Sequence, residues 1–228
     1  MKRNGMWLLA WAVAVSAAAC GDSTGPAAER NDPGTGTGTM RVLADIEGSD
    51  VAGGFVTDFD VSLRDGGGLP ISGATVTVRN PNLGTVNLLE LSAGSGDYEA
   101  TVNTFAAGDY RLDAVKGADN VQGVVIGGMS AHAILSPQAN DTVAANEPLT
   151  VTWSRPSEAV GADLETRDFE AEGIPDSGTY TVPGADNPPR TDGRIRVWRF
   201  NEVTIAGGLE GSRLKLKVRN TVEPIVAQ

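Results

Sequence analysis

The stretch Arg213-Leu214-Lys215-Leu216-Lys217-Val218-Arg219 alternates strictly between charged and apolar residues. Successive side chains of a β-strand point to opposite faces, so one face of this strand is expected to enter a core and the other to carry four cations. Ile195 and Val197 alternate in the same way with Arg194, Arg196 and Trp198. If the two segments pair as a hairpin, a cationic surface bearing an exposed tryptophan results. Such a row either keeps a solvated edge strand from aggregating or meets an anionic partner.

Alternation of the same kind recurs through the preceding 170 residues or so, between turns rich in glycine, proline and asparagine. A chain of 228 residues with 29 glycines suits two turn-dense β domains. We therefore predict an all-β protein of two consecutive antiparallel β-sandwiches, residues 40–128 and 129–228, each folding independently. The expected core positions of the first domain are Met40, Val42, Ala44, Ile46, Phe59, Val61, Leu63, Ala74, Val76, Val78, Tyr98, Ala100, Val102, Tyr110, Leu112 and Ala114.

Two stretches carry family resemblances. Leu69-Pro70-Ile71-Ser72-Gly73-Ala74-Thr75-Val76-Thr77-Val78, with Gly96-Asp97-Tyr98 and Gly108-Asp109-Tyr110-Arg111-Leu112, resembles carboxypeptidase regulatory-like and prealbumin-like β-sandwich domains. Ser136 to Val143, followed by Leu149-Thr150-Val151-Thr152-Trp153, resembles the first strands of immunoglobulin-like or fibronectin-like bacterial modules. The resemblances imply two Ig-like sandwiches, with Trp153 in the second core. They say little about function, because one fold serves many functions.

The N-terminus has the features of an export signal. Lys2 and Arg3 precede an apolar run of 14 residues, from Met6 to Ala19, which is shorter than the roughly 20 residues that span a bilayer. Ala17-Ala18-Ala19-Cys20-Gly21 resembles the lipobox of bacterial lipoproteins. That resemblance implies cleavage of residues 1–19, diacylation of Cys20 and attachment to a cell-envelope membrane, with Gly21 favouring the outer over the inner membrane. Residues 20–39 then form a lipidated, flexible linker, since they have almost no large apolar side chains.

Composition excludes several classes of function. The formal net charge is −11, and export removes Lys2 and Arg3 as well, so no basic surface for nucleic acid is expected. The single cysteine rules out internal disulfides, and its place before the linker leaves no thiolate for catalysis or zinc binding in the folded part. No cofactor is predicted.

Candidates for catalysis and metal binding are few. His132, the only histidine, lies at the domain junction without a Gly-x-Ser-x-Gly motif, and we expect it to make one structural hydrogen bond. Asp58, Asp60 and Asp65 could share a strand face as weak calcium ligands, although an ordinary solvated acidic face explains them as well. Paired carboxylates of a glycoside hydrolase stay open, because their separation is set only by the fold.

These observations lead to one functional hypothesis and two alternatives. The chain is predicted to be a non-enzymatic envelope lipoprotein that acts as a binding or structural module, anchored through Cys20. Its expected partner is an envelope protein or an anionic glycan, bound at Arg213, Lys215, Lys217, Arg219, Arg194, Arg196 and Trp198. The alternatives are a carbohydrate-binding accessory module and a carboxylate-dependent hydrolase.

Overall fold

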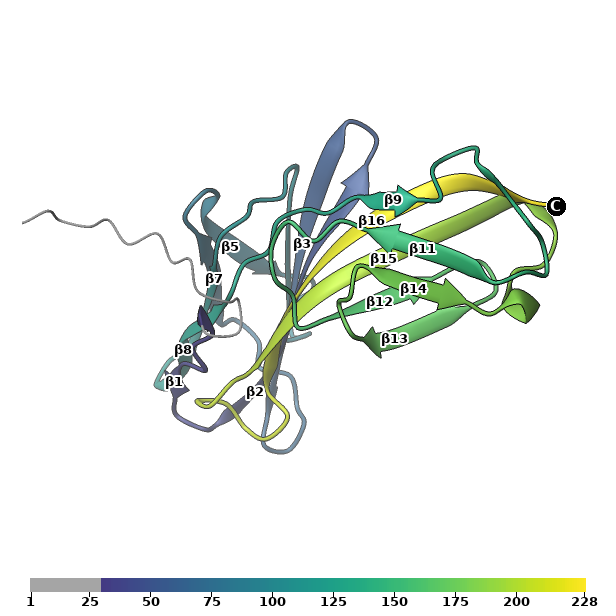
Figure 1. The fold of residues 1–228 in the computed structure, drawn as a ribbon. Helices are drawn as coiled ribbons and strands as arrows, with labels where there is room; N and C mark the ends of the chain where they lie inside the picture. The colour runs from purple at the N-terminus through teal and green to yellow at the C-terminus, as the bar shows by residue number, and fades with distance from the viewer. Residues whose placement is uncertain (1–29) are drawn as a thin grey trace, which may run out of the picture.

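The computed structural model describes residues 30–228, so the predicted signal peptide and Cys20 lie outside the described residues. Apart from one short 3-10 helix, the regular elements of the described part are β-strands (Figure 1). The protein is an all-β sandwich protein, as predicted. The elements are β1 (Thr35–Gly36), β2 (Met40–Val51), β3 (Gly54–Asp65), β4 (Thr75–Asn80), β5 (Gly84–Glu90), β6 (Asp97–Val102), β7 (Tyr110–Lys116), β8 (Asp119–Ile126), β9 (Ile134–Ser136), β10 (Thr142–Val143), β11 (Leu149–Trp153), β12 (Gly161–Glu165), β13 (Glu170–Ile174), β14 (Thr179–Val182), η2 (Gly184–Asp186), β15 (Arg190–Thr204) and β16 (Arg213–Ala227).

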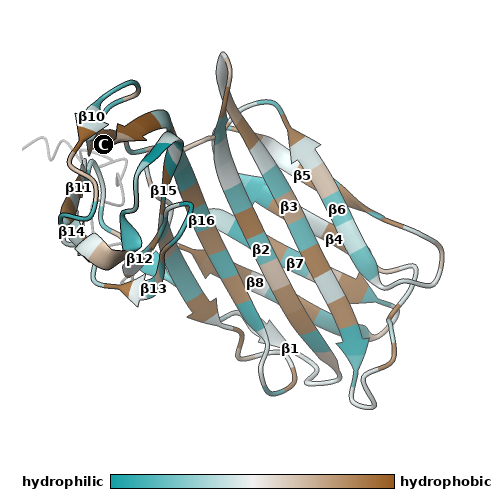
Figure 2. Cartoon of the chain, turned by 90° about the vertical axis from the view of Figure 1, so that its right-hand side faces the viewer, coloured by the Kyte–Doolittle hydropathy of each residue, from teal (hydrophilic) through white to brown (hydrophobic). Residues whose placement is uncertain are grey.

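The first sandwich packs one sheet, β1-β8-β7-β4-β5, against another that runs β6-β3-β2-β16-β15. Strand β5 belongs to both layers, because its first five residues pair with β4 and its last two pair with β6. Hydrophilic and hydrophobic bands alternate along β16, β2 and β3, as the period of two requires (Figure 2). Most of the expected core positions are buried, whereas Ala74, Ala100 and Val102 are only partly buried against the core.

The second sandwich uses the same long hairpin. Strands β15 and β16, 15 residues each, continue past the first core. There β15 pairs with β12, which in turn pairs with β13, while β14-β11-β9 form the facing sheet (Figure 1). Trp153 is 3 % exposed in this second core, as predicted. The hairpin is thus shared: Leu214, Leu216 and Val218 enter the first core, and Val222 and Ile225 enter the second.

This sharing differs from the expectation of two sandwiches divided after residue 128. The parallel pairing of β16 with β2, from Arg213↔Leu43 to Arg219↔Ser49, places the end of the chain inside the first sandwich. Without it, the inner face of β2 would lose the apolar neighbours Leu214 and Leu216, both fully buried. Residues 40–128 therefore do not contain a complete core.

The last ten residues of the predicted flexible linker, residues 30–39, belong to the fold. Residues 30–39 are ordered: β1 pairs with the edge of β8, and Asp32 exchanges backbone hydrogen bonds with Val125 at 2.8 and 2.9 Å. Apolar burial is not needed here, because backbone hydrogen bonds to an open sheet edge hold the segment. Gly36 is required for the close fit, since a Cβ on it would lie 2.3 Å from the Gly207 oxygen.

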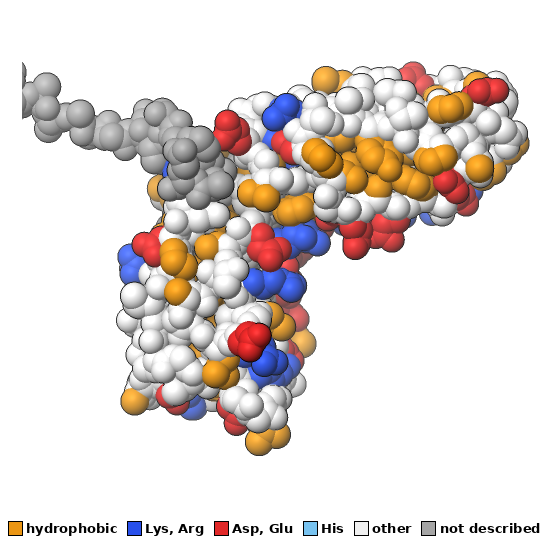
Figure 3. All heavy atoms as spheres, turned by 60° about the horizontal axis from the view of Figure 1, so that its bottom comes forward, with side chains coloured by type: hydrophobic (Ala, Val, Ile, Leu, Met, Phe, Trp, Pro, Cys, Tyr) orange, Lys and Arg blue, Asp and Glu red, His pale blue; other side chains and the backbone are white. Residues whose placement is uncertain are grey.

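The two sandwiches form an angled, two-lobed molecule (Figure 3). Side-chain hydrogen bonds join the lobes at the bend: Asn201 Nδ2 donates to the Gly127 carbonyl at 2.7 Å, and Ile134 N donates to Asn220 Oδ1 at 3.2 Å. Charged side chains of both signs gather along the inner side of the angle (Figure 3). Within residues 30–228, no helix is long and apolar enough to span a bilayer.

Candidate functional site

The predicted cationic row exists as a row but does not lie on an edge strand. Arg213, Lys215, Lys217 and Arg219 alternate with fully buried Leu214, Leu216 and Val218, so they share the outer face of β16. Strand β16 lies between β15 and β2, both of which cover its backbone hydrogen-bonding groups. The row therefore does not protect a solvated edge strand from aggregation, and that interpretation is wrong, because β16 is paired on both sides at these residues.

Carboxylates of β2 neutralise part of the row. Arg213 Nη2 lies 3.6 Å from Asp45 Oδ2, and Arg219 Nη1 lies 3.5 Å from Glu47 Oε1. Lys215 Nζ sits 4.1 Å from the ring centroid of Phe200, in a cation–π contact. Lys217 has no carboxylate within 4 Å in the described part of the chain. The surface is consequently mixed in charge, with Lys215 and Lys217 as its cations without a carboxylate partner.

Strand β15 contributes the remaining predicted residues to the same face. Arg194 Nη2 and Arg196 Nη1 lie 2.5 and 3.5 Å from Glu165 Oε1 on β12. Trp198, expected to be exposed, is half-buried and donates its Nε1 hydrogen to Glu47 Oε1 at 3.3 Å. Trp198 on β15 lies opposite Arg219 on β16, and both contact Glu47 on β2. Glu47 therefore links the three strands. The structure therefore brings all seven predicted residues onto one continuous sheet face, which we call the shared face.

The acidic candidates do not form a metal site. Asp58 and Asp60 lie on the outer face of β3, where burial and the charges of Glu99, Asp58, Asp45 and Glu47 raise the pKa of Asp60. Asp65 does not share their face, because it lies five positions after Asp60, an odd number, and successive side chains of a strand point to opposite faces. Its Oδ1 instead accepts the backbone hydrogens of Gly67 and Leu69. Among residues 30–228, no three His, Cys, Asp or Glu side chains are grouped to hold a metal ion.

A buried ion pair at the bend was not foreseen from the sequence. Arg199 is 0 % exposed, and its Nη2 and Nε lie 2.6 and 3.0 Å from Asp176 Oδ2 and Oδ1. Trp153 Nε1 donates to the same carboxylate at 2.9 Å. Burial alone would raise the pKa of Asp176, but hydrogen bonds from Arg199 and Trp153 hold it below its usual value. The signal was present, since Arg199 falls on the core side of the alternation that contains Ile195 and Val197.

His132 lies in the same region, and within residues 30–228 its ring makes no hydrogen bond to a side chain. It is 4 % exposed, and its Nε2 lies 3.2 Å from the Val197 carbonyl oxygen, which is the predicted structural hydrogen bond. Burial, together with the charge of Arg199, lowers the pKa of His132 to about 4. At neutral pH the imidazole is uncharged, and among residues 30–228 its Nδ1 has no hydrogen-bond partner. The arrangement stabilises the bend and does not assemble a triad.

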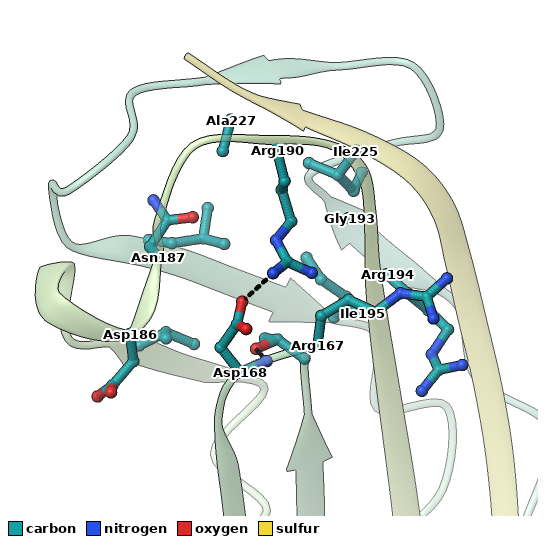
Figure 4. A pocket seen from close by; sticks show the side chains of 13 residues that line it. Arg167, Asp168, Asp186, Asn187, Arg190, Gly193, Arg194, Ile195, Ile225 and Ala227 are labelled. Atoms are coloured by element: carbon teal, nitrogen blue, oxygen red, sulfur yellow. Dashed lines mark hydrogen bonds and ion pairs between the residues drawn. The ribbon is translucent and has the colours of Figure 1, made fainter.

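A small pocket at the far end of the second sandwich holds no ligand-sized space (Figure 4). Ile195, Ile225 and Ala227 form part of its lining, and Arg190 points across it to Asp168, with 2.5 Å between Nη2 and Oδ2. Its volume of about 20 Å³ leaves room for roughly one water molecule. This pocket is a packing feature capped by an ion pair.

Comparisons with known proteins find structural similarity only. No protein-family model matches the chain, and no curated protein matches it. It is similar to the fibronectin(III)-like modules of CbhA from Clostridium thermocellum, with a TM-score of 0.28 and 15 % identity over 78 % of this chain and 92 % of that one. It is also similar to the adhesin InvE of Yersinia pseudotuberculosis, with a TM-score of 0.28 and 19 % identity over 86 % of this chain and 61 % of that one. A third similarity is to the BSP domain of a biofilm-associated protein, with a TM-score of 0.25 and 13 % identity over 82 % of this chain and 29 % of that one.

Proposed function

We propose that this chain is a lipid-anchored, non-enzymatic binding module of a bacterial cell envelope, and that its shared face binds an envelope protein. The anchor rests on the sequence, where a solitary cysteine follows an apolar run and three alanines. Attachment through several acyl chains is effectively stable, since each buried CH₂ contributes about 0.8 kcal/mol. The folded part is then free to serve a partner.

The continuity of the shared face is the observation that carries the proposal. Strands β12, β15, β16, β2 and β3 are neighbours in one sheet that runs through both lobes. Their outer sides alternate between carboxylates, such as Glu165 and Glu47, and cations, such as Lys215 and Lys217. A surface with stripes of both signs suits a partner with a complementary pattern, and charge complementarity contributes specificity and association rate. Protein surfaces offer such patterns, whereas a uniformly anionic polymer meets repulsion from the acidic stripes.

The ordered N-terminal segment limits how far this module can reach. Residues 30–39 belong to the fold, so nine residues (21–29) lie between Cys20 and Arg30, and Arg30 is ten residue steps from the anchor instead of the 20 expected for Met40. A fully extended chain of ten residues covers at most about 33–36 Å. The bend between the lobes, where Arg30 Nη2 donates to the Gly128 carbonyl at 2.9 Å, is therefore held close to the membrane.

The anchor is tested by labelling cells with a palmitate analogue. The wild-type chain should take up label, and Cys20→Ala should not. Equal labelling of both would contradict anchoring through Cys20. The outer-membrane assignment is tested in the same cells, because fractionation should place the labelled protein with outer-membrane markers.

The binding face is tested with a soluble chain of residues 21–228 and isolated envelopes. Lys215→Glu combined with Lys217→Glu should abolish association, because both cations point away from the core and lack carboxylate partners. Lys116→Glu combined with Arg167→Glu makes the same charge change at two exposed cations outside the seven residues of the shared face and is the matched control. Equal loss in both variants would indicate nonspecific charge effects. Binding that survives protease treatment of the envelopes would favour the glycan partner over a protein.

A further inference from the structure

A second charged feature lies on the other sheet of the first sandwich. Arg79 on β4 and Arg111 on β7 are direct cross-strand partners, and both are exposed. Their chain neighbours Val78 and Leu112 are buried, so both arginine side chains project outward from the solvent-facing side of the sheet. Directly opposite residues have Cβ atoms about 4.5–5.5 Å apart, which brings the two guanidinium groups within reach of one ligand.

This pair is only partly neutralised. Arg111 Nε lies 3.6 Å from Asp113 Oδ2, the same separation as in the Arg213–Asp45 pair, while Asp113 Oδ1 accepts the Gly123 amide hydrogen at 2.7 Å. Within residues 30–228, Arg79 has no ion pair and no hydrogen bond, so it is the guanidinium of the pair that lacks a carboxylate. Asp109, the other carboxylate nearby, lies 3.2 Å from Arg30 Nη1. Like charges directly opposite one another destabilise a sheet, so an anion between them would remove an unfavourable interaction.

The sheet surface around the pair is hollowed. Two adjoining hollows share Arg79 and Arg111: Pro81 and Thr85 help line one, and Thr77 and Gln122 help line the other. The strand register places Thr85, Arg79, Arg111 and Val125 in one line across four strands. Hydroxyl and amide groups therefore flank the charged pair along a shallow, open path.

We propose that this groove, formed by β5, β4, β7 and β8, binds an acidic polysaccharide, with a carboxylate or sulfate of the polymer held between Arg79 and Arg111. Arginine binds planar oxyanions through paired N–H donors, which fixes their orientation. Thr77, Thr85 and Gln122 supply donors and acceptors for sugar hydroxyls next to the anion. An open groove across several strands accommodates a chain that continues past both ends, as a polymer does. The chain as a whole is acidic, so contact with a polyanion depends on this local pair.

The test measures binding of the soluble chain, residues 21–228, to immobilised alginate and dextran sulfate, with uncharged dextran as the ligand control. Arg79→Glu combined with Arg111→Glu should weaken binding by at least about tenfold, and the gentler Arg79→Gln with Arg111→Gln should weaken it in the same direction. Lys116→Glu with Arg167→Glu, at two exposed cations that belong neither to the groove nor to the shared face, is the matched control and should bind as the wild type does. The midpoint of thermal unfolding verifies that each variant is folded.

Three results would overturn this assignment. The first is a wild-type chain that binds neither polyanion, and the second is equal binding to dextran. The third is a loss of binding in the Lys116 and Arg167 variant that matches or exceeds the loss in the Arg79 and Arg111 variants. The outcome is independent of the envelope-protein test, because the two tests use different variants and ligands and a control outside both sites.

Discussion

Core substitutions in the first sandwich should destabilise the second, because the β15–β16 hairpin supplies apolar residues to both cores. Leu63 is 0 % exposed and belongs to the first core only. Leu63→Ala removes a buried side chain and leaves a cavity, which costs about 2–5 kcal/mol. With a urea dependence of about 2–3 kcal/mol per molar, the unfolding midpoint should fall by about 0.7–2.5 M.

Tryptophan fluorescence is the assay that separates the lobes. Of the two tryptophans of residues 30–228, Trp153 lies in the second core and reports on that lobe. Trp198 contacts Glu47 of β2, so it is replaced by phenylalanine in every chain that is compared. If the lobes unfold as one unit, fluorescence and circular dichroism of Leu63→Ala should shift by the same amount of urea. Leu164→Ala in the second core is the reciprocal control.

The reasoning would be refuted by a fluorescence transition that stays at the wild-type midpoint while circular dichroism reveals an earlier step. That result would mean that the hairpin holds the second core even when the first has unfolded. A fragment of residues 40–128 offers a further check. It should stay unfolded, because it lacks Leu214, Leu216 and Val218.

Three further predictions concern the bend, the buried ion pair and the N-terminal segment. Because the pKa of His132 is lowered to about 4 from 6.5, the unfolded state binds its proton first as pH falls. The free energy of unfolding should therefore drop by about 3 kcal/mol between pH 6.5 and 4, and denaturation at several pH values should show a shallower decline for His132→Gln. Asp176→Asn leaves Arg199 buried without a counter-charge and should cost about 3–5 kcal/mol in urea unfolding, whereas Asp168→Asn at the half-exposed Arg190 pair should cost about 1 kcal/mol or less. Gly36→Val should release residues 30–39 from β8, visible as faster limited proteolysis there, while Gly66→Ala, whose Cβ would have its nearest neighbour at 4.0 Å, should not.

Much of the fold was predictable because strand alternation is a local property. The period of two placed Met40, Tyr110 and Leu216 in the core and the four cations of β16 on the outside. Trp153, which shares a strand face with Leu149 and Val151, was correctly predicted to lie in the second core. The same period, read two residues past Val197, would have identified Arg199 as a buried arginine in need of a carboxylate. The lipidation of Cys20 stays a prediction from sequence.

Pairing between distant strands was decided only by the tertiary structure. Nothing in Arg213 to Arg219 states that this strand lies parallel to β2, more than 160 residues earlier, rather than at an edge of its own domain. That choice made the row an interior strand, paired its arginines with Asp45 and Glu47, and joined two expected domains into one shared sheet. The cross-strand meeting of Arg79 and Arg111 has the same origin. Sequence determines which face of a strand is apolar, because that depends on neighbouring residues, whereas the partner of each strand depends on which distant apolar faces bury one another best.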